Sequence, residues 1–124
     1  MDYSGSIMFS ITAQTSESVS AEMPIQPGIL NPFGTVHAGA MLWLADVAAT
    51  TLVLGGRTPS AGMQGFPLAI NLNANLVGNQ HAGVLRAEAV FVKRGRTVSV
   101  VRARVTGDGE RLLAEVTTSH VASG

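Results

Sequence analysis

The most distinctive part of this 124-residue chain reads Asn31-Pro-Phe-Gly-Thr-Val-His-Ala-Gly39 and runs directly into Ala40-Met-Leu-Trp-Leu-Ala-Asp46-Val-Ala-Ala-Thr-Thr-Leu-Val-Leu54. No proline interrupts residues 38–54, and the alanine, leucine and methionine residues there favour a helix. Gly55 and Gly56 follow as a C-terminal stop signal. The sequence therefore predicts a loop that leads into one long helix, which ends at Leu54.

The expected helix is apolar on almost every side. Asp46 is its only charged residue, and only Thr50 and Thr51 add hydroxyl groups. Because a surface helix carries polar residues along one face, we expect protein to cover this one on nearly all sides. A membrane span needs about 20 apolar residues, whereas this segment is shorter and has an acid near its middle. A core helix is therefore expected rather than a membrane helix.

Asp46 permits two interpretations. A carboxylate in an apolar helix is usually satisfied by an ion pair or by backbone donors, which would make its role structural. The alternative is catalytic, because a carboxylate that is shielded from water is a stronger base than one on the surface. The chemistry of the helix alone leaves both interpretations open.

Composition narrows the class of protein. Hydrophobic residues make up 46% of the chain, charged residues 13%, and the formal net charge is zero, so the surface of a lone monomer would be poor in charge. Burial in a homo-oligomer explains this simply, and nucleic-acid binding is not expected without excess positive charge. Cysteine is absent, which excludes disulfides and thiolate nucleophiles. His37, His81 and His120 lack metal-ligand spacing, so neither a metal nor a cofactor is expected.

The length and the N-terminus set further expectations. No internal repeat is visible, and residues 1–124 are expected to form a single domain. The first residues, Met1-Asp-Tyr-Ser-Gly5, lack a basic region followed by an apolar run. We therefore expect no signal peptide and a cytoplasmic location.

Most of the remaining sequence has the pattern of β-strands. Residues 1–11 are expected to form a loose lead-in. The expected strands are residues 16–23, 67–77, 84–92, 97–106 and 111–121. Short turns join the last three, which predicts an antiparallel sheet. One long helix and such a sheet define an α+β fold.

The segment 67–77 is expected to have two different faces. One face should carry Leu68, Ile70, Leu72, Ala74 and Leu76. The other should carry the three asparagines Asn71, Asn73 and Asn75. We interpret the asparagine face as an edge or solvent face, and the alternative is that one asparagine lies near a pocket of a partner subunit.

The loop and helix resemble the signature of the hotdog-fold acyl-CoA thioesterases, in particular the PaaI-like (phenylacetate-pathway) branch of the 4-hydroxybenzoyl-CoA thioesterase superfamily. That family typically has Asn, Gly, His-Gly-Gly and Leu-Ala-Asp at the spacings seen here. The matching residues are Asn31, Gly34, His37, Gly39 and Leu44-Ala45-Asp46. Ala38 departs from the pattern, because the family usually has glycine there. The resemblance extends from about Ser16 to Val121 and implies a curved antiparallel sheet wrapped around one long central helix.

The resemblance implies hydrolysis of acyl-CoA thioesters to a free acid and CoA, with an aromatic or medium-chain acyl group. Asp46 would act as general base or nucleophile, and the backbone N–H of Ala38 would contact the oxyanion. A helix start suits this second role, because its N–H groups are free. Asn31 could hold the attacking water or orient the base. His37 has a structural alternative of equal weight, in which it only fixes the loop.

Substrate contacts are expected at the helix start and at a basic turn. Gly39 follows the oxyanion donor directly, and Lys93, Arg94 and Arg96 form a short basic run. Most short charge runs are only solvated hairpins. Coenzyme A carries phosphates, however, and the resemblance implies that this hairpin lies near the nucleotide end of the substrate. Coenzyme A would thus be part of the substrate and not a separate cofactor.

Helix geometry predicts a homodimer with shared sites. Ala38 and Asp46 lie eight residues apart in the sequence, which separates them by about 12 Å along one helix. One substrate carbonyl cannot reach both on the same helix, so each site should combine residues 31–38 of one chain with Asp46 of its partner. The resemblance implies that two dimers pair into a tetramer.

Two alternative functions remain open. The chain could be a hotdog acyl-thioester dehydratase or hydratase, or a non-catalytic acyl-CoA binding or sensing protein.

Overall fold

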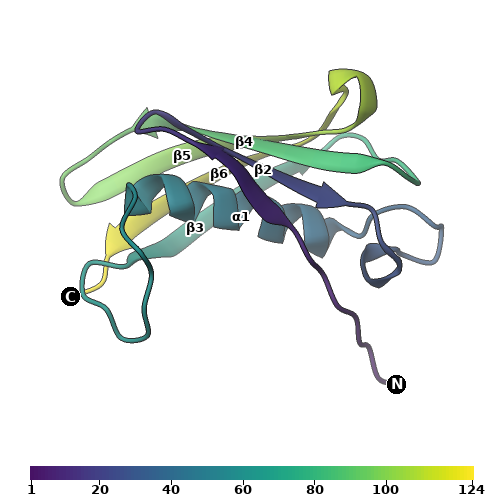
Figure 1. The fold of residues 1–124 in the computed structure, drawn as a ribbon, viewed down its shortest axis with the longest axis horizontal. Helices are drawn as coiled ribbons and strands as arrows, with labels where there is room; N and C mark the ends of the chain where they lie inside the picture. The colour runs from purple at the N-terminus through teal and green to yellow at the C-terminus, as the bar shows by residue number, and fades with distance from the viewer.

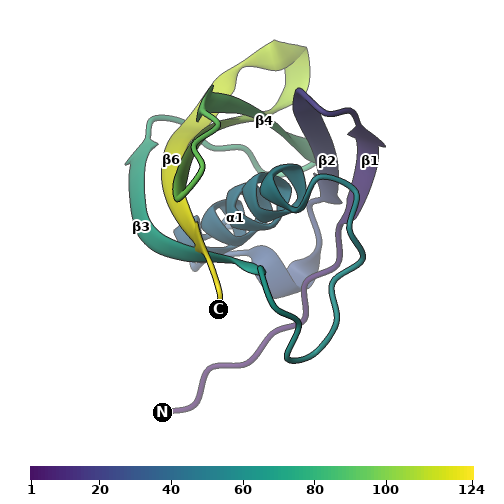
Figure 2. The same ribbon diagram turned by 90° about the vertical axis from the view of Figure 1, so that its left-hand side faces the viewer.

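The computed structural model describes residues 1–124, and the long helix lies at the centre of the fold. Helix α1 spans Ala38–Leu54 and lies against the concave side of a curved sheet (Figures 1 and 2). His37 is the N-cap residue, and its ring accepts a hydrogen bond from the Ala40 N–H. Gly55 ends the helix in the left-handed conformation, with φ of 65°, which costs glycine little. Both ends of the helix therefore lie where the sequence predicts them.

Six antiparallel strands form one sheet in the order β1-β2-β4-β5-β6-β3. Their bounds are β1 Ser10–Gln14, β2 Ser18–Pro24, β3 Pro67–Leu76, β4 Val84–Lys93, β5 Val98–Thr106 and β6 Leu112–Ala122. Two 3₁₀ turns span Pro27–Ile29 and Asp108–Glu110. Strand β3 follows the helix but pairs with the last strand, β6, so that it forms one edge of the sheet. The α+β expectation is confirmed.

Alternate residues of the central strands face the helix and form the core. On β4 and β5 these are small or β-branched side chains, among them Ala87, Ala89, Val101 and Ala103. The side of α1 that faces these strands contains Ala45, Ala48 and Ala49, which are all fully buried. Small side chains on both elements let the helix approach the sheet closely, which maximises the apolar area removed from water.

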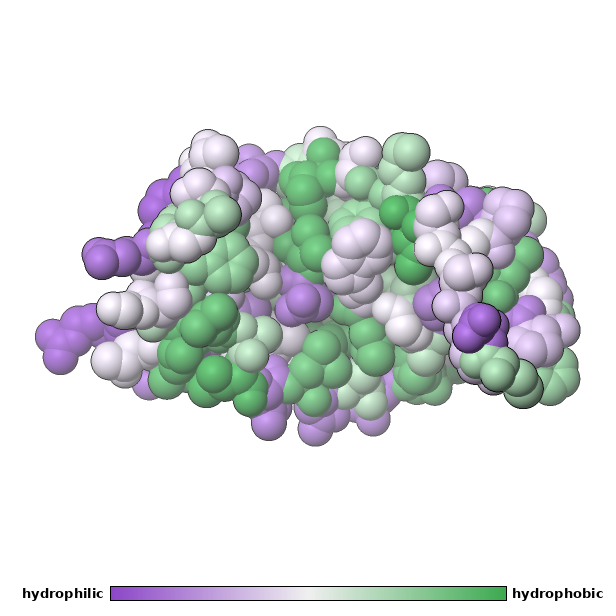
Figure 3. Space-filling view, turned by 90° about the horizontal axis from the view of Figure 1, so that it is seen from below, coloured by the Kyte–Doolittle hydropathy of each residue, from purple (hydrophilic) through white to green (hydrophobic).

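The opposite side of α1 is not covered within one chain. Trp43 is 44% exposed, and Asp46 and Val47 are only half-buried. Figure 3 views this face directly and shows apolar groups gathered across it. The expectation that protein wraps the helix on nearly all sides is therefore wrong for a single chain, because the sheet curves around only one side. No helix in the structure has the length and apolarity to cross a membrane.

Two local features differ from the expected strands. Residues 10–14 form β1, which pairs with β2, although the expected lead-in reaches residue 11 and no strand is expected before residue 16. Every residue of β1 is exposed, so the segment lacks the alternation that marks a half-buried strand. In β3 the register shifts between Ala69 and Asn71. On one side of such a bulge, each residue points to the face of the sheet opposite to the one that strict alternation predicts. Leu68 and Leu72 therefore lie on different faces, although the sequence predicts the same face for both.

The three asparagines lie as the edge-face interpretation predicts for a single chain, and a position of one of them near a partner subunit stays a prediction. Strand β3 is an edge strand, and Asn71, Asn73 and Asn75 are all exposed.

Candidate functional site

The loop before α1 is held in shape by the side chain of Asn31. Its Oδ1 accepts hydrogen bonds from the backbone N–H groups of Phe33 and Thr35, at 3.0 and 3.1 Å. Its Nδ2 donates to the Thr35 hydroxyl at 2.9 Å. Gly34 completes the turn with φ of +78°, a conformation that favours glycine. Within one chain the Asn31 amide is therefore engaged in its own loop, and its expected contact with water or with the base stays a prediction.

His37 joins this loop to the helix. The Ala40 N–H donates to Nδ1 of the ring at 3.0 Å, so the proton of a neutral ring lies on Nε2. This contact is the loop-fixing role of the structural alternative, and a part in chemistry stays a prediction. Gly39 leaves room for the ring, because a Cβ at Gly39 would lie 3.2 Å from that nitrogen.

The Ala38 N–H is free at the start of α1. Neither this N–H nor the Gly39 N–H donates a hydrogen bond, whereas the Ala40 N–H donates to the His37 ring. Both Ala38 and Gly39 are exposed. Free N–H groups in the first turn of a helix, reinforced by the helix dipole, form a donor site for a negatively charged oxygen. The oxyanion role expected for Ala38 thus has an available donor.

Asn79, which the sequence alone does not identify as a site residue, holds the same loop through two hydrogen bonds. Asn79 accepts a hydrogen bond from the Val36 N–H at 3.0 Å and donates to the Val36 carbonyl at 2.7 Å. His81, which is exposed, lies with Nδ1 3.3 Å from the Gly34 carbonyl oxygen. These contacts join residues more than forty positions apart, so no local signal in the sequence reveals them.

Asp46 lies farther along α1, in a cleft of about 330 Å³. The walls are mostly apolar: Val47, Thr50, Thr51, Leu54, Pro59, Phe66, Pro67, Leu68 and Ala69. Asp46 forms no ion pair, and its Oδ1 is buried without a hydrogen-bond partner. The structural interpretation predicted a carboxylate satisfied by an ion pair or by backbone donors, and neither is present in a single chain.

His120 is the second unexpected residue. It lies on β6 with 1% of its surface exposed, and its Nε2 is 2.8 Å from the Thr118 hydroxyl oxygen. Burial lowers the pKa of His120, while the Pro67 backbone carbonyl and the negative charge of Asp46 raise it. The structure therefore brings a buried imidazole within electrostatic reach of Asp46, although the two lie 74 positions apart in the sequence.

The basic turn borders a separate pocket of about 420 Å³ at the C-terminal end of α1. Arg94, Arg96 and also Arg57 line it, whereas Lys93 does not. Gly95 allows the turn, because a Cβ there would lie 1.9 Å from the Val98 carbonyl oxygen. The pocket thus combines three guanidinium groups at one end of the molecule.

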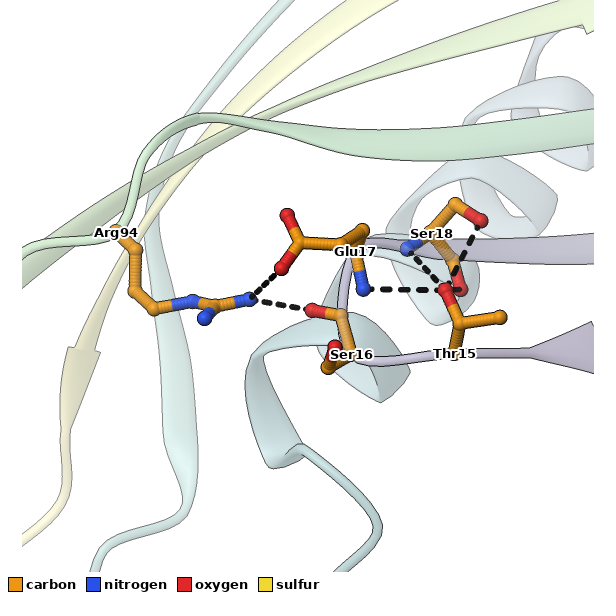
Figure 4. A network of polar contacts seen from close by, with 5 residues as sticks. All are labelled: Thr15, Ser16, Glu17, Ser18 and Arg94. Carbon is orange, nitrogen blue, oxygen red and sulfur yellow. Dashed lines mark hydrogen bonds and ion pairs between the residues drawn. The ribbon is translucent and has the colours of Figure 1, made fainter.

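Arg94 also has a structural role. Its guanidinium donates to the Ser16 carbonyl and lies 3.7 Å from the Glu17 carboxylate in the turn between β1 and β2 (Figure 4). It also stacks over the Phe91 ring, 4.4 Å from the ring centre. Arg57 is held by the carbonyls of Leu54 and Gly65. Arg96 makes no such contact, so it is the arginine most available to a ligand.

One protomer therefore brings Asn31, His37, Ala38 and Gly39 together at the start of α1, and holds Asp46 apart from them on the same continuous helix. The eight positions from Ala38 to Asp46 correspond to about 12 Å along the axis. Arg94 and Arg96 lie at the other end of the helix, beside its last residues.

Comparison with known proteins identifies the class of protein. The family described as Thioesterase superfamily matches residues 33–114. This range contains the loop from Phe33 onward, the whole of α1 and strands β3, β4 and β5. The chain belongs to the thioesterase superfamily and is a thioester hydrolase.

Two relatives illustrate this membership. ComA2 of Bacillus subtilis (strain 168), named as a candidate esterase, is 31% identical over 110 residues, which cover 83% of this chain and 79% of ComA2. The 1,4-dihydroxy-2-naphthoyl-CoA hydrolase of Listeria monocytogenes serotype 1/2a (strain 10403S) is 26% identical over 92 residues, 74% of this chain and 72% of its own length.

Two solved structures confirm the hotdog fold. A variant of a thioesterase from Staphylococcus aureus subsp. aureus Mu50 superposes with a TM-score of 0.85 at 24% identity, covering 94% of this chain and 93% of its own. A thioesterase-named protein from Streptococcus pneumoniae TIGR4, solved with coenzyme A, gives a TM-score of 0.82 at 19% identity, with 94% and 87% covered.

Proposed function

We propose that this enzyme hydrolyses acyl-CoA thioesters to a free acid and CoA, and that it belongs to the PaaI-like branch of its superfamily. The observation that carries the proposal is the pairing of a free N–H at the start of α1 with a carboxylate in an apolar cleft farther along. The Listeria relative is named for a CoA thioester of an aromatic acid, and the Streptococcus structure contains coenzyme A. Both support a CoA thioester as substrate, and the name of the Listeria relative supports an aromatic acyl group; we propose an aromatic or medium-chain acyl group.

Asp46 acts as a general base in this proposal. The carboxylate takes a proton from water while the water oxygen forms a bond to the thioester carbon. The carbonyl electrons move onto oxygen, where the Ala38 N–H stabilises the charge. When the carbonyl re-forms, the C–S bond breaks, and the sulfur of CoA leaves with the proton that Asp46 carried.

The alternative is that Asp46 attacks the carbonyl itself and forms an anhydride. A single turnover in isotopically labelled water distinguishes the two. We expect the label in the released acid only, and label in the Asp46 side chain would establish the nucleophilic route.

A homodimer completes each site in this proposal. The Ala38 N–H and Asp46 of one helix lie too far apart for one carbonyl, but two antiparallel helices related by a two-fold axis would bring the start of one beside the middle of the other. The exposed face of α1 and the exposed apolar residues of the β3 edge support such an assembly. We further propose that dimers pair into a tetramer.

The basic turn binds the CoA phosphates in this proposal. Arg96 and Arg94 line a pocket large enough for a phosphate group, and the neighbouring Lys93 is exposed and adds positive charge to the same turn. Arg57 is a further donor that the sequence analysis did not include. Guanidinium groups bind phosphate oxygens in bidentate pairs, which explains why arginines predominate there.

A substrate panel tests the function. Purified protein is incubated with phenylacetyl-, hydroxybenzoyl-, short-chain, long-chain and 3-hydroxyacyl-CoA, and released thiol is measured. We expect hydrolysis of aromatic or medium-chain thioesters. Binding of acyl-CoA without thiol release would favour the sensing alternative, for which Ala38 in place of the usual glycine is the motivation. Formation of an enoyl-CoA from the 3-hydroxyacyl-CoA would favour the dehydratase alternative.

A further inference from the structure

His120 and Asp46 share an unusual property. Among the buried side-chain nitrogen and oxygen atoms of this protein, only Asp46 Oδ1 and His120 Nδ1 lack a hydrogen-bond partner. Leaving a buried polar atom without a partner destabilises a fold, so these two atoms call for a function.

The two residues line two cavities that share Pro67, the first residue of β3. Asp46 lines the apolar cleft together with Pro67 and Ala69, and His120 lines the arginine pocket, again together with Pro67. In the sheet His120 is directly opposite Ala69 of β3, so both face the helix. The negative charge of Asp46 raises the pKa of His120, which burial lowers.

One ring nitrogen of His120 contacts Thr118, and the other has no hydrogen-bond partner. His120 Nε2 is occupied by the Thr118 hydroxyl, and both residues are 1% exposed. A neutral ring that accepts the Thr118 hydroxyl proton at Nε2 carries its own proton on Nδ1. The free donor of His120 is then Nδ1–H, and the nearby acceptors are the Pro67 carbonyl and the Asp46 carboxylate.

The two oxygens of Asp46 have different surroundings. Oδ1 is buried, whereas the residue as a whole is half-buried and lines the cleft. Oδ2 is therefore the oxygen that a water molecule or substrate in the cleft can reach. A donor on the Oδ1 side would fix the carboxylate rotamer and keep Oδ2 directed into the cleft.

We propose that His120, held by Thr118, is a positioning residue for Asp46: its Nδ1–H binds Oδ1 directly or through one water molecule and holds Oδ2 towards the thioester. This inference rests on the proposed function, because it assigns Asp46 the role of base. The charged groups around the ring are Asp46 from α1 on one side and Arg57, Arg94 and Arg96 of the pocket on the other.

Two substitutions of similar size separate positioning from simple packing. His120→Asn keeps an N–H close to the position of Nδ1, and His120→Gln keeps a polar group only close to the position of Nε2. We expect His120→Gln to lower kcat about ten- to a hundredfold with KM unchanged, and His120→Asn to retain most of kcat. Ser119→Ala, on the neighbouring position of β6, should behave as the wild type. Equal kcat values for the Gln, Asn and wild-type proteins would overturn the proposal, as would equal losses in both variants.

A measurement that needs no activity tests the pair itself. Ring ¹⁵N NMR of the wild type should show the proton on Nδ1, and the pKa of His120 should fall in Asp46→Asn, because the Asp46 charge raises it. A proton on Nε2, or an unchanged pKa, would overturn the pair. If the wild type hydrolyses no thioester, the proposed function fails, and this titration still decides the pair.

Thr118→Val provides a second route if the His120 variants do not fold. It keeps the shape of the side chain and leaves the ring in place, but it removes the hydroxyl that fixes the tautomer. We expect a severalfold loss of kcat and a mixed tautomer in the NMR spectrum. Unchanged kcat together with an unchanged tautomer would contradict the proposal.

Discussion

At the scale of single residues, Asp46 provides the most direct test. Asp46→Asn keeps the shape of the side chain but cannot accept the proton of water. We expect kcat to fall by about 10²- to 10⁴-fold, with the melting temperature and acyl-CoA affinity nearly unchanged. Thiol release, calorimetry and thermal unfolding measure the three quantities. Near-normal kcat would contradict the assignment, and unfolding of the variant would support the structural interpretation.

Ala38→Pro isolates the backbone donor, because proline is favoured at the first position of a helix and lacks only the N–H. His37 already has the extended conformation that precedes proline well, with φ of −72° and ψ of 149°. We expect kcat to fall by about 10²- to 10³-fold with an unchanged helix content. The control is Ala38→Gly, which restores the usual family residue and should keep or raise kcat. Unchanged turnover in Ala38→Pro would exclude this N–H as the oxyanion donor.

His120 makes stability depend on pH. Its folded pKa is lowered from 6.5 because burial disfavours the charged ring, so the unfolded chain binds the proton more readily. The contribution of neutral His120 is complete above that value and is lost as the pH falls below it towards the folded pKa. Denaturant unfolding at several pH values should show this loss in the wild type and a smaller loss in His120→Gln. An identical pH dependence in both proteins would contradict the assignment.

At the scale of elements, the turn between β4 and β5 separates binding from structure. Arg96→Gln should raise KM for acyl-CoA while sparing a truncated pantetheine thioester, because only the complete substrate carries the nucleotide phosphates. Lys93→Gln should have a smaller effect of the same kind. Arg104→Gln, on the convex face of β5, is the control. Equal losses with both substrates would assign the turn a structural role, which Arg94 already has through Ser16 and Glu17.

The elements differ in how far the sequence predicts them. Helix α1 was predicted from Ala38 to Leu54 because its signals are local, an apolar run followed by two glycines. Strand β1 was missed because its residues are exposed and its pairing with β2 depends on tertiary context. The bulge in β3 has no sequence signal, so the expected faces were wrong at one end.

The candidate site, too, is predicted from the sequence only where its residues lie close together along the chain. The Ala38 donor and Asp46 belong to one continuous segment, and the family resemblance selected them. Asn79 and His120 contribute through contacts with residues more than forty positions away in the sequence. His120 has only the composition of a core strand around it, so its position near Asp46 appears only once β6 and α1 are packed together.

At the scale of the whole molecule, a single chain leaves an apolar surface exposed beside the proposed site. The apolar side chains exposed on β3 and α1 include Trp43, Leu68, Ile70, Leu72 and Leu76, and an exposed edge strand readily pairs with another chain. Exposed apolar surface of this kind marks an interaction site. In the homodimer that we propose, the second copy would cover this surface and bring a second helix start to Asp46.

Mixing two inactive chains tests this arrangement. A chain with Asp46→Asn retains the Ala38 donor, and a chain with Ala38→Pro retains the base. If sites are shared, the mixed dimer has one intact site, built from Ala38 of the first chain and Asp46 of the second. Random exchange of equal amounts makes half the dimers mixed, so about a quarter of the wild-type activity should return. Two Asp46→Asn preparations mixed with each other give the baseline. Subunit exchange shown by mass spectrometry without any return of activity, or an active monomer, would rule out sites shared between chains.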